Sequence, residues 1–229
     1  MLMRRVAMAS VLLALTMPAR AESVWVGGVS VADTTQVAYL GRLAPLPGQR
    51  FGDGWSYSVF ADNIEYEYDK GLFVVDARAR GLRVGLSRQV PIAGGSFSYG
   101  LGVQARETRL SPDDIDNHNR GSQVRAVGEL QWRSSEQANW RSGFYGQYVF
   151  AARNDYAKLF VGRRLDNDIA IGPQFWTGGD PTYRVHGAGI ALDGWRLGAA
   201  RITAFVGAEH AEGGRTRPAV GIEFSLYRN

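Results

Sequence analysis

The chain has 229 residues, of which 45% are hydrophobic and 11% aromatic, values too high for a disordered protein. It contains no Cys, which excludes a disulfide framework, a thiolate metal site and a Cys nucleophile. The sequence pI is 9.5, but three of the 26 basic residues (Arg4, Arg5 and Arg20) precede residue 22, so from residue 22 onward 23 basic residues oppose 22 acidic ones. This balance gives little attraction to nucleic acid, and no nucleic-acid partner is expected.

The first 21 residues have the order of a secretory signal peptide. Residues 1–5 are short and basic, residues 6–17 are largely apolar, and Ala19-Arg20-Ala21 has the small-x-small form of a cleavage site. The apolar segment would rise only about 18 Å as a helix, less than the roughly 30 Å of a hydrocarbon core. We therefore expect cleavage after Ala21, export through the inner membrane, and a single domain over residues 22–229. A buried N-terminal helix is the alternative.

After residue 22, apolar and polar residues alternate with a period of two, which is typical of β-strands. In residues 124–133, for example, the face with Val124, Leu130 and Trp132 lies opposite the face with Arg125 and Glu129. Turn signals such as Asp33-Thr34 and Asp193-Gly194 divide the chain into about twelve strands. The predicted strands are residues 23–32, 35–44, 55–69, 72–88, 96–110, 120–134, 140–152, 155–165, 168–177, 182–193, 197–210 and 217–227.

An even number of antiparallel strands of this length fits an outer-membrane barrel. The charged face of each strand would line a polar lumen. Aromatic residues near the strand ends would form the girdles at the two membrane interfaces. These are Trp25, Trp55, Tyr66, Tyr68, Trp132, Trp140, Trp176, Tyr183, Trp195 and Tyr227. We predict an all-β, antiparallel up-and-down barrel of about twelve strands in the outer membrane of a Gram-negative cell. A soluble periplasmic β-barrel that binds a small ligand is the alternative, because soluble sheets alternate too.

One strand reverses its apolar phase near Gly81. Val75, Ala77 and Ala79 occupy odd positions before this glycine, whereas Leu82, Val84 and Leu86 occupy even positions after it. Glycine inside a strand often permits a bulge, and bulges curve a sheet. We therefore expect Gly81 to permit a bulge or close packing at a point where the sheet curves.

The residue types that carry most enzyme chemistry are sparse. The three histidines, His118, His186 and His210, lack the spacing of a zinc site. Some small outer-membrane barrels modify lipids with a His/Ser pair on one strand, but His186 has no Ser within several residues, and His118 and Ser122 flank a loop. We expect no catalytic residue, metal or cofactor, and a small lipid-modifying barrel enzyme is the alternative.

Two further features concern binding. Residues 111–119 concentrate oxygen ligands, but their spacing is not that of an EF-hand, so a solvated turn-forming loop is favoured over a calcium site. The basic residues are nearly all Arg. Most of these arginines should pair with carboxylates inside a packed barrel, although arginines and aromatic rings in a lumen could also bind anionic or hydroxyl-rich polymers.

Several short motifs resemble the bacterial cellulose biosynthesis protein S family. They begin with Val26-Gly27-Gly28, Tyr39-Leu40-Gly41 and residues 44–48, and they continue with the distinctive loop from Arg109 to Asp114 followed by Arg120-Gly121-Ser122. Residues 162–164, 171–174, 178–180 and 187–189 are similar as well. The resemblance covers most of the chain in order.

This resemblance implies a secreted outer-membrane β-protein associated with cellulose synthesis and export in biofilm exopolysaccharide production. The family offers no catalytic residues to carry over. We therefore expect a non-enzymatic accessory protein in contact with outer-membrane lipid and with cellulose or components of its synthase or export machinery. The hypothesis for the contact site is the distinctive loop, with Asp113, Asp114 and Arg120 as its ligand- or partner-binding residues.

Overall fold

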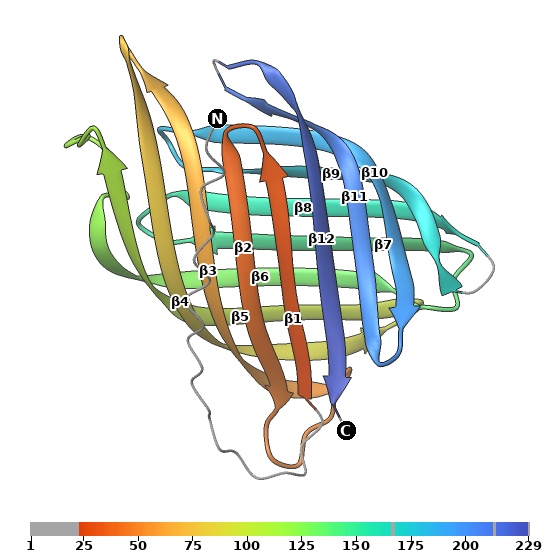
Figure 1. Cartoon of the computed structure of the whole chain (residues 1–229). Helices are drawn as coiled ribbons and strands as arrows, with labels where there is room; N and C mark the ends of the chain where they lie inside the picture. Colours follow the sequence, from red (N-terminus) through yellow and green to blue (C-terminus); the bar gives the residue numbers. More distant parts are fainter. Residues whose placement is uncertain (1–22, 166–167, 213, 229) are drawn as a thin grey trace.

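The computed structural model describes residues 23–165, 168–212 and 214–228. Its twelve strands form one closed barrel in which each strand pairs with its neighbours in the chain, and β1 closes the wall against β12 (Figure 1). All pairs are antiparallel. The predicted all-β barrel is confirmed. The predicted signal peptide and its cleavage site lie outside the described residues.

The strands follow the predicted boundaries closely. Their bounds are β1 Ser23–Ala32, β2 Thr35–Pro45, β3 Gly54–Lys70, β4 Phe73–Ile92, β5 Gly95–Ser111, β6 Gly121–Ser134, β7 Trp140–Val149, β8 Asn154–Arg164, β9 Ala170–Gly179, β10 Arg184–Leu197, β11 Ala200–Ala211 and β12 Thr216–Arg228.

The first residue of β1 and the last residue of β12 lie side by side. Ser23 at the start of β1 pairs with Arg228 at the finish of β12. We call this end of the barrel the terminus end and the other the opposite end. The connections at residues 46–53, 93–94, 135–139 and 198–199 lie at the terminus end, as do residues 165 and 168–169. Those at residues 33–34, 71–72, 112–120, 150–153 and 180–183 lie at the opposite end, as do residues 212 and 214–215.

The outer wall is apolar where a membrane would surround it. Side chains such as Leu101, Val124 and Val206 are 70%, 72% and 61% exposed, although in water such residues would be expected in a core. Their neighbours in sequence point into the lumen, because successive side chains of a strand face opposite sides. The outer wall therefore has the polarity of a lipid-facing surface.

Five tryptophans lie on the outer wall near the terminus end, where an interfacial girdle would be. They are Trp25, Trp55, Trp132, Trp140 and Trp195, each within a few residues of a strand end. The girdle prediction was wrong for Trp176 and for the three tyrosines Tyr66, Tyr68 and Tyr183. Trp176 and Tyr68 are only 8% and 7% exposed, and these side chains pack inside the barrel. Strand register places Trp176, Tyr66 and Tyr68 on the lumen face, and Tyr183 packs against Tyr66 from the connection between β9 and β10. A list of aromatic residues reveals neither.

Of the two roles expected for Gly81, the bulge does not form, whereas close packing does, because a Cβ at this position would lie 2.5 Å from a carboxylate oxygen of Asp62. β4 pairs continuously with β3 and β5 on both sides of this residue. The apolar phase reverses because the surroundings of the strand change. Before Gly81, Val75 and Ala77 point inward into a buried cluster, whereas after it Leu82 and Leu86 point outward and are 54% and 43% exposed. β4 thus contributes inward-facing residues to an internal apolar cluster near the opposite end and outward-facing residues to the lipid-facing wall over the rest of its length.

A bulge occurs instead in β10, between Asp193 and Trp195. Asp193-Gly194 was predicted as a turn between two strands, and this prediction was wrong. β10 continues to Leu197, and the turn lies at residues 198–199. Gly194 has a φ of +91°, which L side chains rarely adopt. Because a bulge adds one residue, it re-aims the side chains that follow it.

Candidate functional site

The lumen carries charged pairs at mid-height. The Arg83 guanidinium contacts the Glu129 carboxylate and lies 4.5 Å from the centre of the Phe60 ring. The Tyr145 hydroxyl donates a 2.7 Å hydrogen bond to the same carboxylate. Arg106 is similarly held 2.7 Å from Asp62. The prediction that lumen arginines pair with carboxylates is confirmed at these positions.

Other contacts connect parts of the wall that are far apart. Lys158 on β8 donates to Glu223 on β12 at 2.6 Å, although these strands are four places apart in the barrel. The Trp176 indole on β9 donates to Glu209 on β11 at 2.9 Å. The lumen at this height is therefore bridged by side chains.

Loop 112–120 folds into the mouth at the opposite end. Asp114 is only 6% exposed. Its carboxylate accepts a 2.8 Å hydrogen bond from the Tyr68 hydroxyl and a second from Lys70. Asn117 donates to the same Tyr68 hydroxyl at 2.9 Å. These contacts fasten the loop to β3.

The loop also meets the connection between β9 and β10 across the mouth. Asn119 donates to the Asp180 carboxylate. Tyr183, from the same connection, stacks on Tyr66 with ring centres 4.9 Å apart, and its hydroxyl lies 2.7 Å from that of Thr35. We call loop 112–120 together with residues 180–183 the plug. Its contacts reach β2 and β3, so it spans the mouth.

The structure brings together two of the three residues predicted to bind a ligand or partner and separates the third. Arg120 lies 2.6 Å from Asp113 in an ion pair whose side chains are 44% and 58% exposed. Asp114 points the other way, into the plug. Asp113 and Arg120 are thus available at the surface, whereas Asp114 holds the loop in place.

Replacing Asp114 by Asn should loosen the plug, and acidification should do the same to the native chain. The hydrogen bond from Lys70 holds the pKa of the Asp114 carboxyl below its usual range. Its stabilising effect is therefore present above roughly pH 4, the unfolded value, and is lost as the pH falls through the lower folded value. Hydrogen exchange of residues 112–120 should be faster in D114N than in the native protein at pH 7, with the difference vanishing at low pH. Equal exchange at pH 7 would contradict this role.

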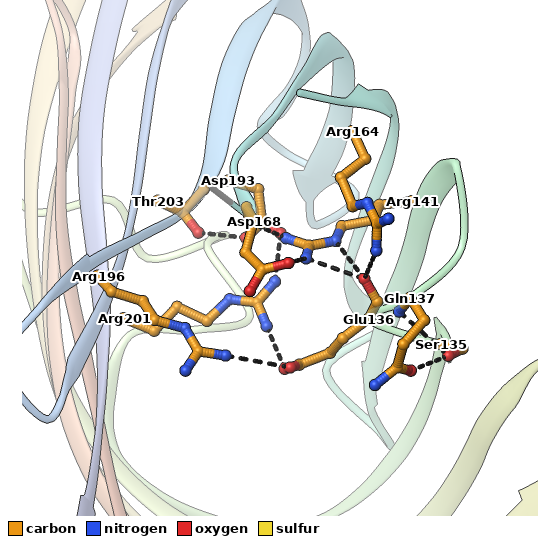
Figure 2. Close-up of polar contacts among 10 residues, drawn as sticks. All are labelled: Ser135, Glu136, Gln137, Arg141, Arg164, Asp168, Asp193, Arg196, Arg201 and Thr203. Carbon is orange, nitrogen blue, oxygen red and sulfur yellow. Dashed lines mark hydrogen bonds and ion pairs between the residues drawn. The ribbon is translucent and has the colours of Figure 1, made fainter. Parts of the chain in front are cut away.

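A second polar cluster lies at the mouth of the terminus end (Figure 2). The connection between β6 and β7 carries Glu136, whose carboxylate lies 2.6 Å from Arg201 and 3.4 Å from Arg196. The main-chain oxygen of Glu136 accepts hydrogen bonds from Arg141 Nε and Nη2 at 3.2 and 3.0 Å, and from Arg164 at 3.3 Å. Four arginines therefore converge on one residue of a loop.

The bulge in β10 creates the room for this cluster. A side chain at position 194 would meet Arg141 at 2.6 Å and the main-chain oxygen of Asp168 at 2.7 Å. With glycine there, Arg141 donates to that oxygen. On the other side of the bulge, Asp193 holds Arg201 at 2.6 Å and accepts from Thr203 at 2.7 Å. Gly194 thus allows the two halves of the cluster to come together.

This arginine cluster is absent from the sequence-based hypothesis. Glu136 and Arg201 are 65 residues apart, and no local pattern predicts that they meet. The sequence feature that could have indicated the cluster is the number of arginines, and the absence of lysines, at the strand ends between residues 133 and 201.

Two of the histidines lie on the outer wall near the opposite end. His186 pairs with His210 across β10 and β11. Their Nδ1 atoms lie 2.9 Å from the Thr177 hydroxyl and 3.3 Å from the Thr216 hydroxyl. Neither ring is hydrogen-bonded to a carboxylate in the part of the chain that the structure describes. Within the same residues, no group of three or more His, Cys, Asp or Glu is placed to hold a metal ion.

No described helix has the length and apolar character to cross a membrane.

The closed wall, its apolar outer surface and its polar, bridged lumen define an outer-membrane-type β-barrel with a plug at one mouth and an arginine cluster at the other. The family model "Cellulose biosynthesis protein BcsS" matches residues 24–228. The chain therefore belongs to the BcsS family and has an accessory role in cellulose biosynthesis.

Solved structures of outer-membrane proteins are similar to this chain at low sequence identity. A KdgM porin is 12% identical, with a TM-score of 0.50 over 87% of this chain and 97% of that chain. The beta domain of the Bordetella autotransporter BrkA is 13% identical, with a TM-score of 0.44 over 90% of this chain and 99% of that chain. A comparison with curated protein sequences finds no match. The likeness to the porin supports the outer-membrane type of fold and nothing about its ligand.

Proposed function

We propose that this protein is a non-enzymatic accessory of cellulose production, exported to the outer membrane, that holds the nascent glucan or an export component. The observation that carries the proposal is the exposed pair of Asp113 and Arg120 on the plug, in a chain of a cellulose biosynthesis family. The pair offers a charged donor and a charged acceptor side by side, which suits hydroxyl-rich or polar partners. Asp114 contributes by fixing the loop that presents them.

The non-enzymatic part of the proposal is supported by how the polar residues are used. Outer-wall histidines pair with threonines rather than with a serine nucleophile. Nucleophilic catalysis needs a nucleophile, a base and a group that orients the base. Lumen carboxylates such as Glu129 and Glu223 are engaged with cations. These groups support a packed barrel, and we assign the loops to binding.

The proposed function is tested by cellulose output in a producing strain. The variant D113N/D114N/R120Q should make less cellulose, measured as glucose released by cellulase, while the amount of folded barrel stays the same. The double variant D113N/R120Q should show most of this decrease in cellulose output if the surface pair makes the contact. The matched control is D33N/R217Q, an exposed ion pair at the same end of the barrel but outside the plug, which should leave output unchanged. Undiminished output from the triple variant would remove the loop from the proposal.

The location is tested on the same strain by membrane fractionation. We expect extraction by detergent only, together with a change in gel mobility on boiling, as a stable membrane barrel shows. Recovery in the soluble periplasm would overturn the outer-membrane location, and the apolar outer wall would then need a protein partner.

A further inference from the structure

The terminus end is strongly basic. In its connections and in the five strand residues nearest this end, the described residues include ten arginines and four acidic residues. The arginines are Arg42, Arg50, Arg88, Arg133, Arg141, Arg163, Arg164, Arg196, Arg201 and Arg228, and the acidic residues are Asp53, Glu136, Asp168 and Asp193. The mid-lumen charges are balanced in pairs, so this end is where a negative partner would be attracted.

The arginine cluster at this end recognises two different groups of Glu136. Arg196 and Arg201 bind its carboxylate, and Arg141 and Arg164 bind its main-chain oxygen. The guanidinium group presents several donors in a rigid fork, which matches carboxylates and carbonyls. The site is therefore shaped around a glutamyl residue within a peptide.

From this geometry we propose that the mouth at the terminus end binds an acidic peptide segment of a second protein, and that loop 135–139 occupies the site in the unbound barrel. Uncharged glucan would not need the four arginines. An anionic glycan would supply carboxylates but not a peptide carbonyl next to each one, which Arg141 and Arg164 bind here. An acidic peptide supplies both groups.

The cluster is built so that the loop can leave and the arginines stay. The Glu136 and Arg196 side chains are 49% and 61% exposed, so water and a competing carboxylate can reach their contact. Arg141 and Arg201 are 5% and 16% exposed. Asp168 and Asp193 hold these two arginines independently of Glu136. The site would thus be preorganised once the loop is displaced, which lowers the cost of binding.

The test uses the full chain, purified in detergent, with fluorescently labelled hexaglutamate as the probe. The native protein should bind it in a salt-sensitive way. E136Q should bind about tenfold more tightly, because the loop competes less well for Arg196 and Arg201. R196Q and R196Q/R201Q should bind about tenfold or more weakly. R78Q/R109Q, which removes two cross-strand neighbours at the opposite end, is the matched control and should bind like the native protein.

Unchanged affinity in E136Q or in R196Q would overturn the proposal, and R196Q keeps the test valid if the double variant fails to fold. Tighter binding of hexagalacturonate than of hexaglutamate would replace the peptide by an anionic glycan and would also overturn it. Because binding is measured on purified protein, its failure is distinct from a failure of the cellulose experiment.

Discussion

Leu101→Arg should remove most of the folded barrel from the membrane. Leu101 is 70% exposed on the outer wall in the middle section of β5, where it pairs with Leu86 and with Gly128. An arginine at the bilayer midplane of such a wall costs about 2–4 kcal/mol. This is a large part of the stability of a typical domain, so the fraction of protein that shows heat-modifiable mobility should fall sharply.

The matched control is Leu72→Arg. Leu72 is 97% exposed in the two-residue connection between β3 and β4, so the same change of residue type there should leave the folded fraction unaltered. Equal losses in the two variants would point to a general effect of the added charge. No loss in L101R would contradict a lipid-facing wall at β5.

Glu129→Ala should destabilise the barrel more than the simultaneous replacement of Glu129 and Arg83. The Arg83 side chain is 9% exposed, and Glu129 is its carboxylate partner. Removing one member of a buried pair leaves an uncompensated charge and typically costs about 3–5 kcal/mol, whereas an apolar pair of similar volume is often nearly neutral. In E129A the Tyr145 hydroxyl also loses the carboxylate that accepts its hydrogen bond, which adds to the cost.

The comparison is made with E129A, R83M and R83M/E129L, each unfolded by urea in detergent while gel mobility reports the folded fraction. The double variant should have a midpoint close to that of the native protein and above that of E129A. An R83M/E129L midpoint below that of E129A would mean that the polar pair stabilises the lumen by itself.

The sequence by itself determined the strands, their number and the type of fold. Alternation with a period of two is a local property of an extended chain, and the contrast between Leu101 or Val124 on one face and Gln104 or Arg125 on the other needs no knowledge of distant residues. The family motifs were likewise readable in the linear chain. The same local reasoning could not choose between a bulge and close packing at Gly81, and it failed at Asp193-Gly194, because both outcomes depend on what lies against the strand.

Only the tertiary structure decided which polar residues meet. Barrel closure brings Lys158 to Glu223 and Glu136 to Arg201, over separations of 65 residues in each case. It also turns Asp114 inward to Tyr68 while leaving Asp113 at the surface with Arg120. The physical reason is that a strand's alternation fixes which side of the wall a side chain faces, whereas the stagger and closure of the barrel set its partner across the lumen.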